Sequence, residues 1–248
     1  MKKYFVLFAM LFCACSQGVA ETKCFIAQEN GKILIQEGDC DKKYPPGCDF
    51  SIVLSLMGFD AGILQDESNP EWPYKEGYET FLNVWKAPHV PRTWIVDSCV
   101  WYSGNIVEKL GFEKIKEYIV KFNYGNKDVT GMNRTDWPGA LLISPKEQVE
   151  FLQRVVDRKL PLSDKAYEMT QKIIFVQDLP GTWKLYGKSG IGEAKNLENA
   201  GWFIGWIEKG NRRIPFSNLI ASKENGNSMR ARNEAFSKLC KLINELEK

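Results

Sequence analysis

Residues 44–64 carry a strongly apolar run behind a Pro-Pro-Gly turn, and this stretch predicts a buried central helix. A Pro-Pro-Gly turn keeps the first part out of a helix, and the run that begins at Phe50 is too apolar for a surface helix. Cys48 and Asp49 directly follow the turn. We therefore expect them at the helix N-terminus, where free N–H groups and the helix dipole favour negative charge.

Helical spacing of apolar residues recurs at residues 93–110 and 112–122, with Gly111 between the two predicted helices. A capping box opened by Ser144 predicts a further helix that ends near residue 158, and a last helix is expected over residues 228–246. Residues 66–91 are rich in Pro, Trp, Tyr and Gly without sustained periodicity, so we expect an irregular segment there.

Extended patterns predict five strands, which lie near the two ends of the chain. Two hairpins are indicated, one around Asn30-Gly31 and one around Gly210-Asn211. The expected strands are residues 23–28, 32–36, 183–186, 201–209 and 213–221. Strands from both termini with helices inserted between them predict an α/β lobe and a helical lobe, and the cleft between lobes is the default place for a small-molecule site.

Composition adds bounds on size and partner. The chain has 248 residues, 44% hydrophobic and 26% charged, which suits one large globular domain or two interleaved lobes. Its 33 basic residues nearly balance 31 acidic ones, for a formal net charge of +2. This balance gives no basis for a nucleic-acid or anionic-membrane partner, so a small-molecule partner is expected.

The first 20 residues have the pattern of a secretory signal peptide. Lys2 and Lys3 precede an apolar run that ends near Ala14, and small residues lead to a cleavage site after Ala20. The run is too short to span a membrane, so we expect no transmembrane segment in the mature chain, residues 21–248, and a periplasmic or secreted location. Cys15 leaves a lipoprotein anchor open as an alternative.

Seven cysteines are present, and removal of the two in the expected signal peptide leaves five. Cys24 and Cys40 flank the first predicted hairpin, and in an oxidising compartment they form either a disulfide or two free thiols. The odd number means that at least one cysteine is free or pairs between chains.

Four motifs in order resemble those of class D (oxacillinase-type) serine β-lactamases. They are Ile-x-Leu-Ser-Leu-Met-x-Phe-Asp-Ala from residue 52, Ser98-Cys99-Val100, Tyr124-Gly125-Asn126 and Lys188-Ser189-Gly190. The resemblance spans about residues 24–221. It implies a serine β-lactamase/penicillin-binding transpeptidase-like fold of the α/β (α+β) class, with an antiparallel sheet flanked by helices plus a helical lobe, over residues 21–248.

The first motif departs from this family at the positions that carry its chemistry. Class D enzymes read Ser-Thr-Phe-Lys, where the serine attacks the lactam carbonyl and the lysine, as a carbamate, is the general base. This chain reads Cys48-Asp49-Phe50-Ser51, and no other Ser-x-x-Lys occurs in it. Since Ser51 cannot form a carbamate, the base of the family is missing, and no other cofactor is expected.

The remaining positions implied by the resemblance can still bind a ligand. Lys188, Ser189 and Gly190 would hold the substrate carboxylate side, with Arg230 or Arg232 as a further partner. Ser98 would relay a proton, and the backbone N–H groups of Cys48 and Ile191 would form an oxyanion hole. Val100 and Leu141 match the apolar lid over the family's lysine. Trp137 lies one residue closer to Ser144 than the family spacing has it, so we expect it to be displaced.

The functional expectation is a protein that recognises penicillins or peptidoglycan-like ligands and is impaired in hydrolysis. As an alternative, a Cys48 thiol can attack an acyl carbon, giving a covalent trap or a hydrolase, although the neighbouring Asp49 opposes thiolate formation. His89 is the sole histidine, and no metal-ligand spacing accompanies it, so no metal site is expected.

Overall fold

The computed structural model describes residues 21–135, 137–193, 197–223 and 227–248. A six-stranded antiparallel sheet with strand order β2-β1-β6-β5-β4-β3 lies at its centre. The strands are β1 (Thr22–Glu29), β2 (Lys32–Gly38), β3 (Phe175–Asp178), β4 (Lys184–Gly192), β5 (Asn199–Lys209) and β6 (Arg212–Ser222). Because β1 pairs with β6, the N-terminal and C-terminal parts of the chain build one sheet, as the sequence predicts.

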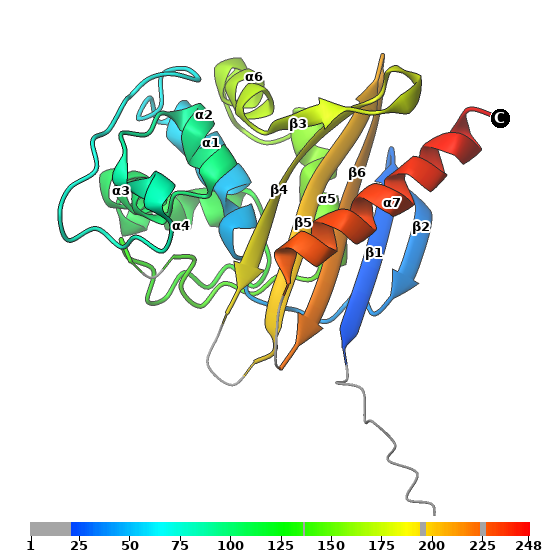
Figure 1. Cartoon of the computed structure of the whole chain (residues 1–248), viewed down its shortest axis with the longest axis horizontal. Helices are drawn as coiled ribbons and strands as arrows, with labels where there is room; N and C mark the ends of the chain where they lie inside the picture. The colour runs from blue at the N-terminus through cyan, green and yellow to red at the C-terminus, as the bar shows by residue number, and fades with distance from the viewer. Residues whose placement is uncertain (1–20, 136, 194–196, 224–226) are drawn as a thin grey trace, which may run out of the picture.

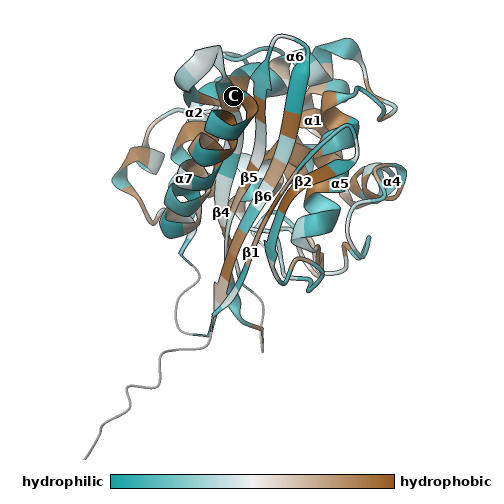
Figure 2. Ribbon diagram, turned by 90° about the vertical axis from the view of Figure 1, so that its right-hand side faces the viewer, coloured by the Kyte–Doolittle hydropathy of each residue, from teal (hydrophilic) through white to brown (hydrophobic). Residues whose placement is uncertain are grey.

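Helices cover both faces of this sheet, and a helical lobe lies beside β4 (Figure 1). The helices are α1 (Ser51–Asp60), α2 (Pro91–Asp97), α3 (Val100–Leu110), α4 (Phe112–Lys121), α5 (Pro145–Val156), α6 (Asp164–Ile173) and α7 (Ser228–Leu246). Trp202 and Phe203 of β5 face opposite sides of the sheet and belong to two separate buried clusters. One cluster packs under α7, whose outer surface is largely hydrophilic (Figure 2), and the other joins the sheet to the helical lobe.

Several predicted elements need correction. The helix expected over residues 93–110 is two helices, α2 and α3, because Ser98 adopts a left-handed conformation with φ 53° between them. The central helix begins at Ser51, after a short 3-10 turn, η1 (Cys48–Phe50). Neither α6 nor β3 was predicted, since α6 is short and weakly apolar and β3 is a four-residue edge strand. The helix opened by Ser144, the helix over residues 228–246 and both hairpins are confirmed.

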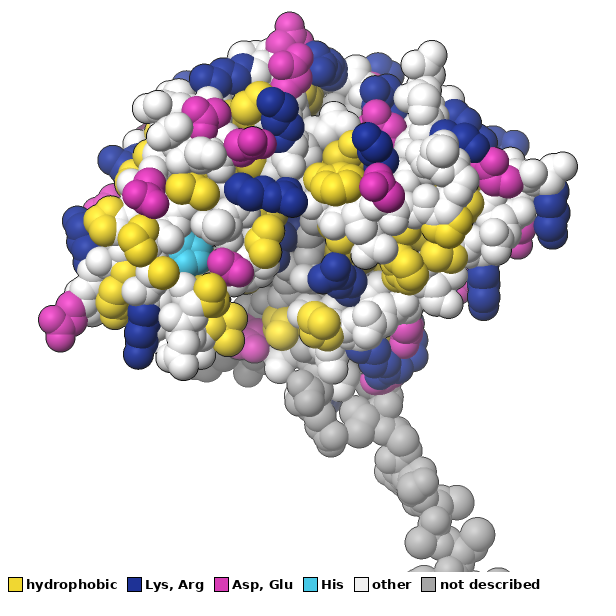
Figure 3. Space-filling model, turned by 45° about the horizontal axis from the view of Figure 1, so that its top comes forward, with side chains coloured by type: hydrophobic (Ala, Val, Ile, Leu, Met, Phe, Trp, Pro, Cys, Tyr) yellow, Lys and Arg dark blue, Asp and Glu magenta, His cyan; other side chains and the backbone are white. Residues whose placement is uncertain are grey.

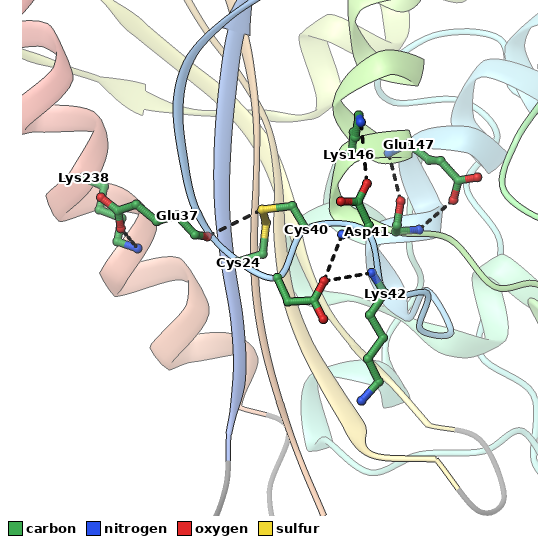
Figure 4. The surroundings of a disulfide bond; sticks show 10 residues. Cys24, Glu37, Cys40, Asp41, Lys42, Lys146, Glu147 and Lys238 are labelled. Carbon is green, nitrogen blue, oxygen red and sulfur yellow. Dashed lines mark hydrogen bonds and ion pairs between the residues drawn. A yellow bond between two sulfur atoms is a disulfide. The ribbon is translucent and has the colours of Figure 1, made fainter.

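Cys24 and Cys40 form a disulfide, so the alternative of two free thiols is wrong (Figure 4). The bridge ties β1 to the segment that follows β2. Two ion pairs join the same segment to the start of α5, from Lys43 Nζ to Glu147 at 2.6 Å and from Lys146 Nζ to Asp41 at 3.6 Å. The segment that leads to the Pro-Pro-Gly turn is therefore anchored on both sides.

Acidic and basic side chains are interspersed over the face shown in Figure 3. Across the described ranges, none of the helices has the length and apolar character needed to cross a bilayer. The predicted signal peptide and the alternative anchor at Cys15 lie outside the described residues.

Candidate active site

The candidate active site lies where the Pro-Pro-Gly turn and η1 meet the end of β4. The approach is backbone to backbone: a Cβ added at Gly47 would overlap the carbonyl of Ile191, and one at Gly190 would lie 2.6 Å from the Cys48 backbone nitrogen. Only glycine permits such contact. The backbones of Cys48 and Ile191, which are expected to form an oxyanion hole, therefore lie on two segments that are in direct contact.

Ser98 and Lys188 are brought together across the cleft. Lys188 Nζ donates a hydrogen bond to Ser98 Oγ at 2.5 Å and another to the Ser189 carbonyl at 2.8 Å. The left-handed break between α2 and α3 turns Ser98 toward β4. Lys188 is only 5% exposed, and burial lowers the pKa of its ammonium group, while Cys48 and Asp49 act in the opposite direction.

Cys48 is partly exposed and carries a thiol whose pKa is raised, chiefly because burial disfavours the charged thiolate. The positive charge of Lys188 opposes this shift and the negative charge of Asp49 adds to it. The structure therefore places the predicted nucleophile within the electrostatic influence of Lys188, but in surroundings that favour the neutral thiol.

Asp49 is fully buried beside Cys48. Its Oδ1 accepts a hydrogen bond from the Gly47 N–H at 2.6 Å, and its Oδ2 accepts one from Gln148 Nε2 at 3.1 Å. The Tyr124 hydroxyl donates to Gln148 Oε1 at 3.2 Å. Burial raises the pKa of Asp49 to about 6, against the lowering effect of the Gly47 N–H. Gln148 is not among the predicted site residues, and its signal in the sequence is a polar residue on the buried face of α5.

Ser51 is the first residue of α1 and is 1% exposed. The position where the family has its carbamate lysine is thus buried and carries a hydroxyl in place of an amine. Leu141 is fully buried and Val100 packs at the margin of the same hydrophobic cluster as α1. Trp137 is also partly buried against that cluster. Among the residues the structure describes, no group of His, Cys, Asp or Glu side chains could hold a metal ion.

A pocket of about 300 Å³ opens beside Lys188 and Ser189. Its basic side chains are Lys188, Arg92 and Arg232, its other walls are mainly apolar, and no acidic residue lines it. The Arg92 guanidinium is occupied by three backbone carbonyls, those of Lys172, Ile173 and Phe175. Such a pocket is suited to an anionic ligand.

The structure distinguishes the two candidate arginines. Arg230 is bound to Glu21 and, one helical turn away, to Glu234 at 3.0 Å. Arg232 lines the pocket, and no carboxylate among the described residues pairs with it. Arg232 is therefore the arginine available to a ligand.

The comparisons with known proteins agree with this geometry. Residues 23–241 match the model of the penicillin binding protein transpeptidase domain. The fold and site therefore define a protein of the penicillin-binding transpeptidase class.

Within the penicillin-binding transpeptidase class, several of the most similar relatives are β-lactamases. The chain is 34% identical to the β-lactamase OXA-9 of Klebsiella pneumoniae over 90% of its own length and 91% of that protein. It is 37% identical to the β-lactamase OXA-1 of Escherichia coli over 76% of its length and 68% of that protein. The crystal structure of the OXA-427 class D β-lactamase superposes with a TM-score of 0.82 at 35% identity, covering 91% of this chain and all of that one. The chain belongs to the class D β-lactamase family.

Proposed function

We propose that this protein recognises penicillins and related β-lactams but is impaired as a hydrolase. The observation that carries the proposal is Ser51, a buried hydroxyl at the start of α1 where the family has its basic lysine. A hydroxyl with an ordinary pKa cannot take a proton from water near neutral pH, so deacylation lacks its general base.

The recognition half of the proposal is supported by the groups that the site retains. Lys188, Ser189 and Arg232 line the pocket, and a β-lactam carries a carboxylate that such groups bind. The same chemistry would accept a peptidoglycan-like ligand with a terminal carboxylate. Ser98 remains bonded to Lys188 and so could deliver a proton to a leaving nitrogen.

A second candidate, a covalent trap, is favoured by Cys48, a free and partly exposed thiol whose backbone lies against Gly190, two residues after Lys188 on β4. In this reaction the Cys48 sulfur forms a bond with the lactam carbonyl carbon and the lactam C–N bond breaks. The thiol proton passes to the nitrogen through Ser98 and Lys188. The thioester would then persist, because no base at position 51 activates water.

Mass spectrometry of the protein incubated with benzylpenicillin separates these functions. Binding without an adduct supports the impaired binder, and a lasting adduct that is absent from Cys48→Ala supports the trap. Cys240→Ser, which removes a free thiol on α7, is the matched control and should leave the adduct unchanged. Rapid turnover of a chromogenic cephalosporin that survives Cys48→Ala would contradict both proposals.

Restoration provides a sharper test of the Ser51 argument. The combined substitution Cys48→Ser, Asp49→Thr and Ser51→Lys returns the family's residues to a backbone that already has the required close contacts. We expect turnover that increases with added bicarbonate, since the lysine base is a carbamate. Continued inactivity of the folded variant would indicate a second defect, for which Trp137 is the candidate.

We also propose that the protein is exported. The Cys24–Cys40 disulfide supports this, since structural disulfides form in oxidising compartments. N-terminal sequencing of the native protein from a cell fraction should begin at Glu21. A start at Cys15 would instead indicate a lipoprotein.

A further inference from the structure

Ser98 and Lys188 form a close pair beside the pocket. Lys188 Nζ lies 2.5 Å from Ser98 Oγ and 2.8 Å from the Ser189 carbonyl oxygen. An ammonium group donates in both contacts. A neutral amine instead accepts the proton of the Ser98 hydroxyl and still donates to the carbonyl. A serine hydroxyl in direct contact with an amine has the geometry of a nucleophile with its general base.

The surroundings of Lys188 favour the neutral amine. The side chain is 5% exposed, and no carboxylate among the described residues forms an ion pair with it. A buried ammonium group without a paired carboxylate is disfavoured. Burial accordingly lowers the pKa of Lys188, and the like charge of Arg232 on α7 acts in the same direction. Cys48 and Asp49 of η1 oppose this shift without reversing it.

The backbone holds Ser98 in a conformation that is uncommon for a residue with a side chain. Its φ of 53° and ψ of 41° lie in the left-handed region, at the break between α2 and α3. Residues in such conformations are concentrated at active sites. Ser98 is partly exposed, and it lies two residues before the 11-residue helix α3. The positive end of that helix dipole favours the negative charge that develops on an attacked carbonyl oxygen.

The pocket beside this pair indicates which acyl compound suits it. The pocket is lined by Lys188, by Ile95 and Val96 at the end of α2, and by further residues that are mainly apolar. A ligand that places a carboxylate beside Lys188 stabilises the ammonium form and so removes the base. An uncharged ester leaves the amine neutral and can pack its apolar part against these walls.

We propose that Ser98 and Lys188 form a serine–lysine pair that takes the acyl group of an uncharged carboxylic ester. Lys188 Nζ accepts the hydroxyl proton as Ser98 Oγ bonds to the ester carbonyl carbon. The ester C–O bond breaks, and the leaving alcohol takes this proton from Nζ. Water then gives a proton to Nζ and its oxygen bonds to the acyl carbon. The bond from this carbon to Ser98 Oγ breaks, and Oγ takes the proton back.

This inference goes beyond the proposed function, which concerns β-lactams and the residue at position 51. Its test uses no β-lactam, so each can fail separately. The probe is p-nitrophenyl acetate, and the protein is the Cys48→Ala variant, which removes a competing thiol. We expect release of p-nitrophenol above the rate in buffer, with an acetyl group on Ser98 in peptide mass spectrometry after acid quenching.

Two substitutions in this background test the two roles. Ser98→Ala should abolish the release above the buffer rate. Lys188→Arg should lower it by about 100-fold or more, because the guanidinium keeps the positive charge but cannot act as a base. Lys184→Ala is the matched control, since Lys184 is an exposed lysine at the other end of β4, and it should leave the rate unchanged.

The pH profile of the parent Cys48→Ala protein gives a measurement that does not depend on the folding of these two variants. The rate above buffer should rise with pH and reach a plateau below pH 10.5, the value for an unperturbed lysine. A rate without such a plateau would overturn the proposal. So would an undiminished rate in Ser98→Ala or in Lys188→Arg, or the absence of release above buffer in the parent.

Discussion

Substitution of Arg232 gives the most direct test of how this protein holds a ligand. Arg232 lines the pocket beside Lys188 and no described carboxylate pairs with it, whereas Arg230, two residues earlier on α7, is bound to Glu21 and Glu234. Arg232→Ala should therefore weaken the binding of a penicillin, and Arg230→Ala should not.

The expected loss of binding free energy in Arg232→Ala is that of one charge-assisted hydrogen bond. Such a bond contributes about 1.5–3 kcal/mol, which corresponds to an increase in Kd of about 10- to 100-fold. Arg232 is only partly buried, so salt should reduce the effect. Arg230→Ala removes only exposed ion pairs, worth at most about 1 kcal/mol of folding stability.

The Kd for a penicillin can be measured by isothermal titration calorimetry in the Cys48→Ala background, where binding is non-covalent. Benzylpenicillin is compared with its methyl ester, which lacks the carboxylate charge. Arg232→Ala should weaken binding of the acid and have little effect on the ester. Equal losses for acid and ester, or a similar loss in Arg230→Ala, would refute the assignment. A parent protein that binds neither compound would instead refute the proposed function.

Three further predictions concern stability. Gly190→Ala should lower the free energy of unfolding by about 1–3 kcal/mol in urea denaturation, because its Cβ meets backbone atoms of η1. Gly62→Ala has nothing within 4 Å of its Cβ and should lose only about 1 kcal/mol, from its positive φ of 72°. Replacing Cys24 and Cys40 together by serine should lower the free energy of unfolding by about 3 kcal/mol, the value for a closed loop of this size, and reduction of the native protein should give the same loss. Equal melting temperatures with and without reductant would contradict this. Burial raises the pKa of the Asp49 carboxyl from 3.8 to about 6. Between these two pH values the folded protein holds a proton on Asp49 that the unfolded chain has lost. The free energy of unfolding should therefore fall by up to about 3 kcal/mol as pH rises through this window. Asp49→Asn should remove that component in pH-dependent denaturation, and an unchanged pH dependence would contradict it.

Much of the fold follows from local signals in the sequence. The capping box at Ser144 is present as predicted, with Ser144 Oγ accepting from the Glu147 N–H at 3.2 Å and Glu147 accepting from the Ser144 N–H at 2.9 Å. Ser98 shows the limit of such signals. A helical pattern runs through it, but it adopts a left-handed conformation, and its hydroxyl accepts a hydrogen bond from Lys188, 90 residues away.

Candidate site residues that belong to a sequence motif could be predicted, whereas those defined only by a three-dimensional contact could not. Cys48, Ser98 and Lys188 come from motifs; the structure joins Ser98 to Lys188 by a hydrogen bond and places the Cys48 backbone against Gly190 of the same strand. The choice between Arg230 and Arg232 needed the pocket and the partner Glu21, which is distant in sequence. The pairing of Asp49 with Gln148 likewise depends on how α5 packs against the turn.

The backbone contacts of Gly47 and Gly190 have an evolutionary consequence. They bring η1 against the end of β4 mainly through main-chain atoms, so this approach does not use the side chains at positions 48 and 51. Mutation can therefore remove or restore reactivity at these two positions while the architecture persists. Selection can act on ligand capture and on turnover as separate traits in one lineage.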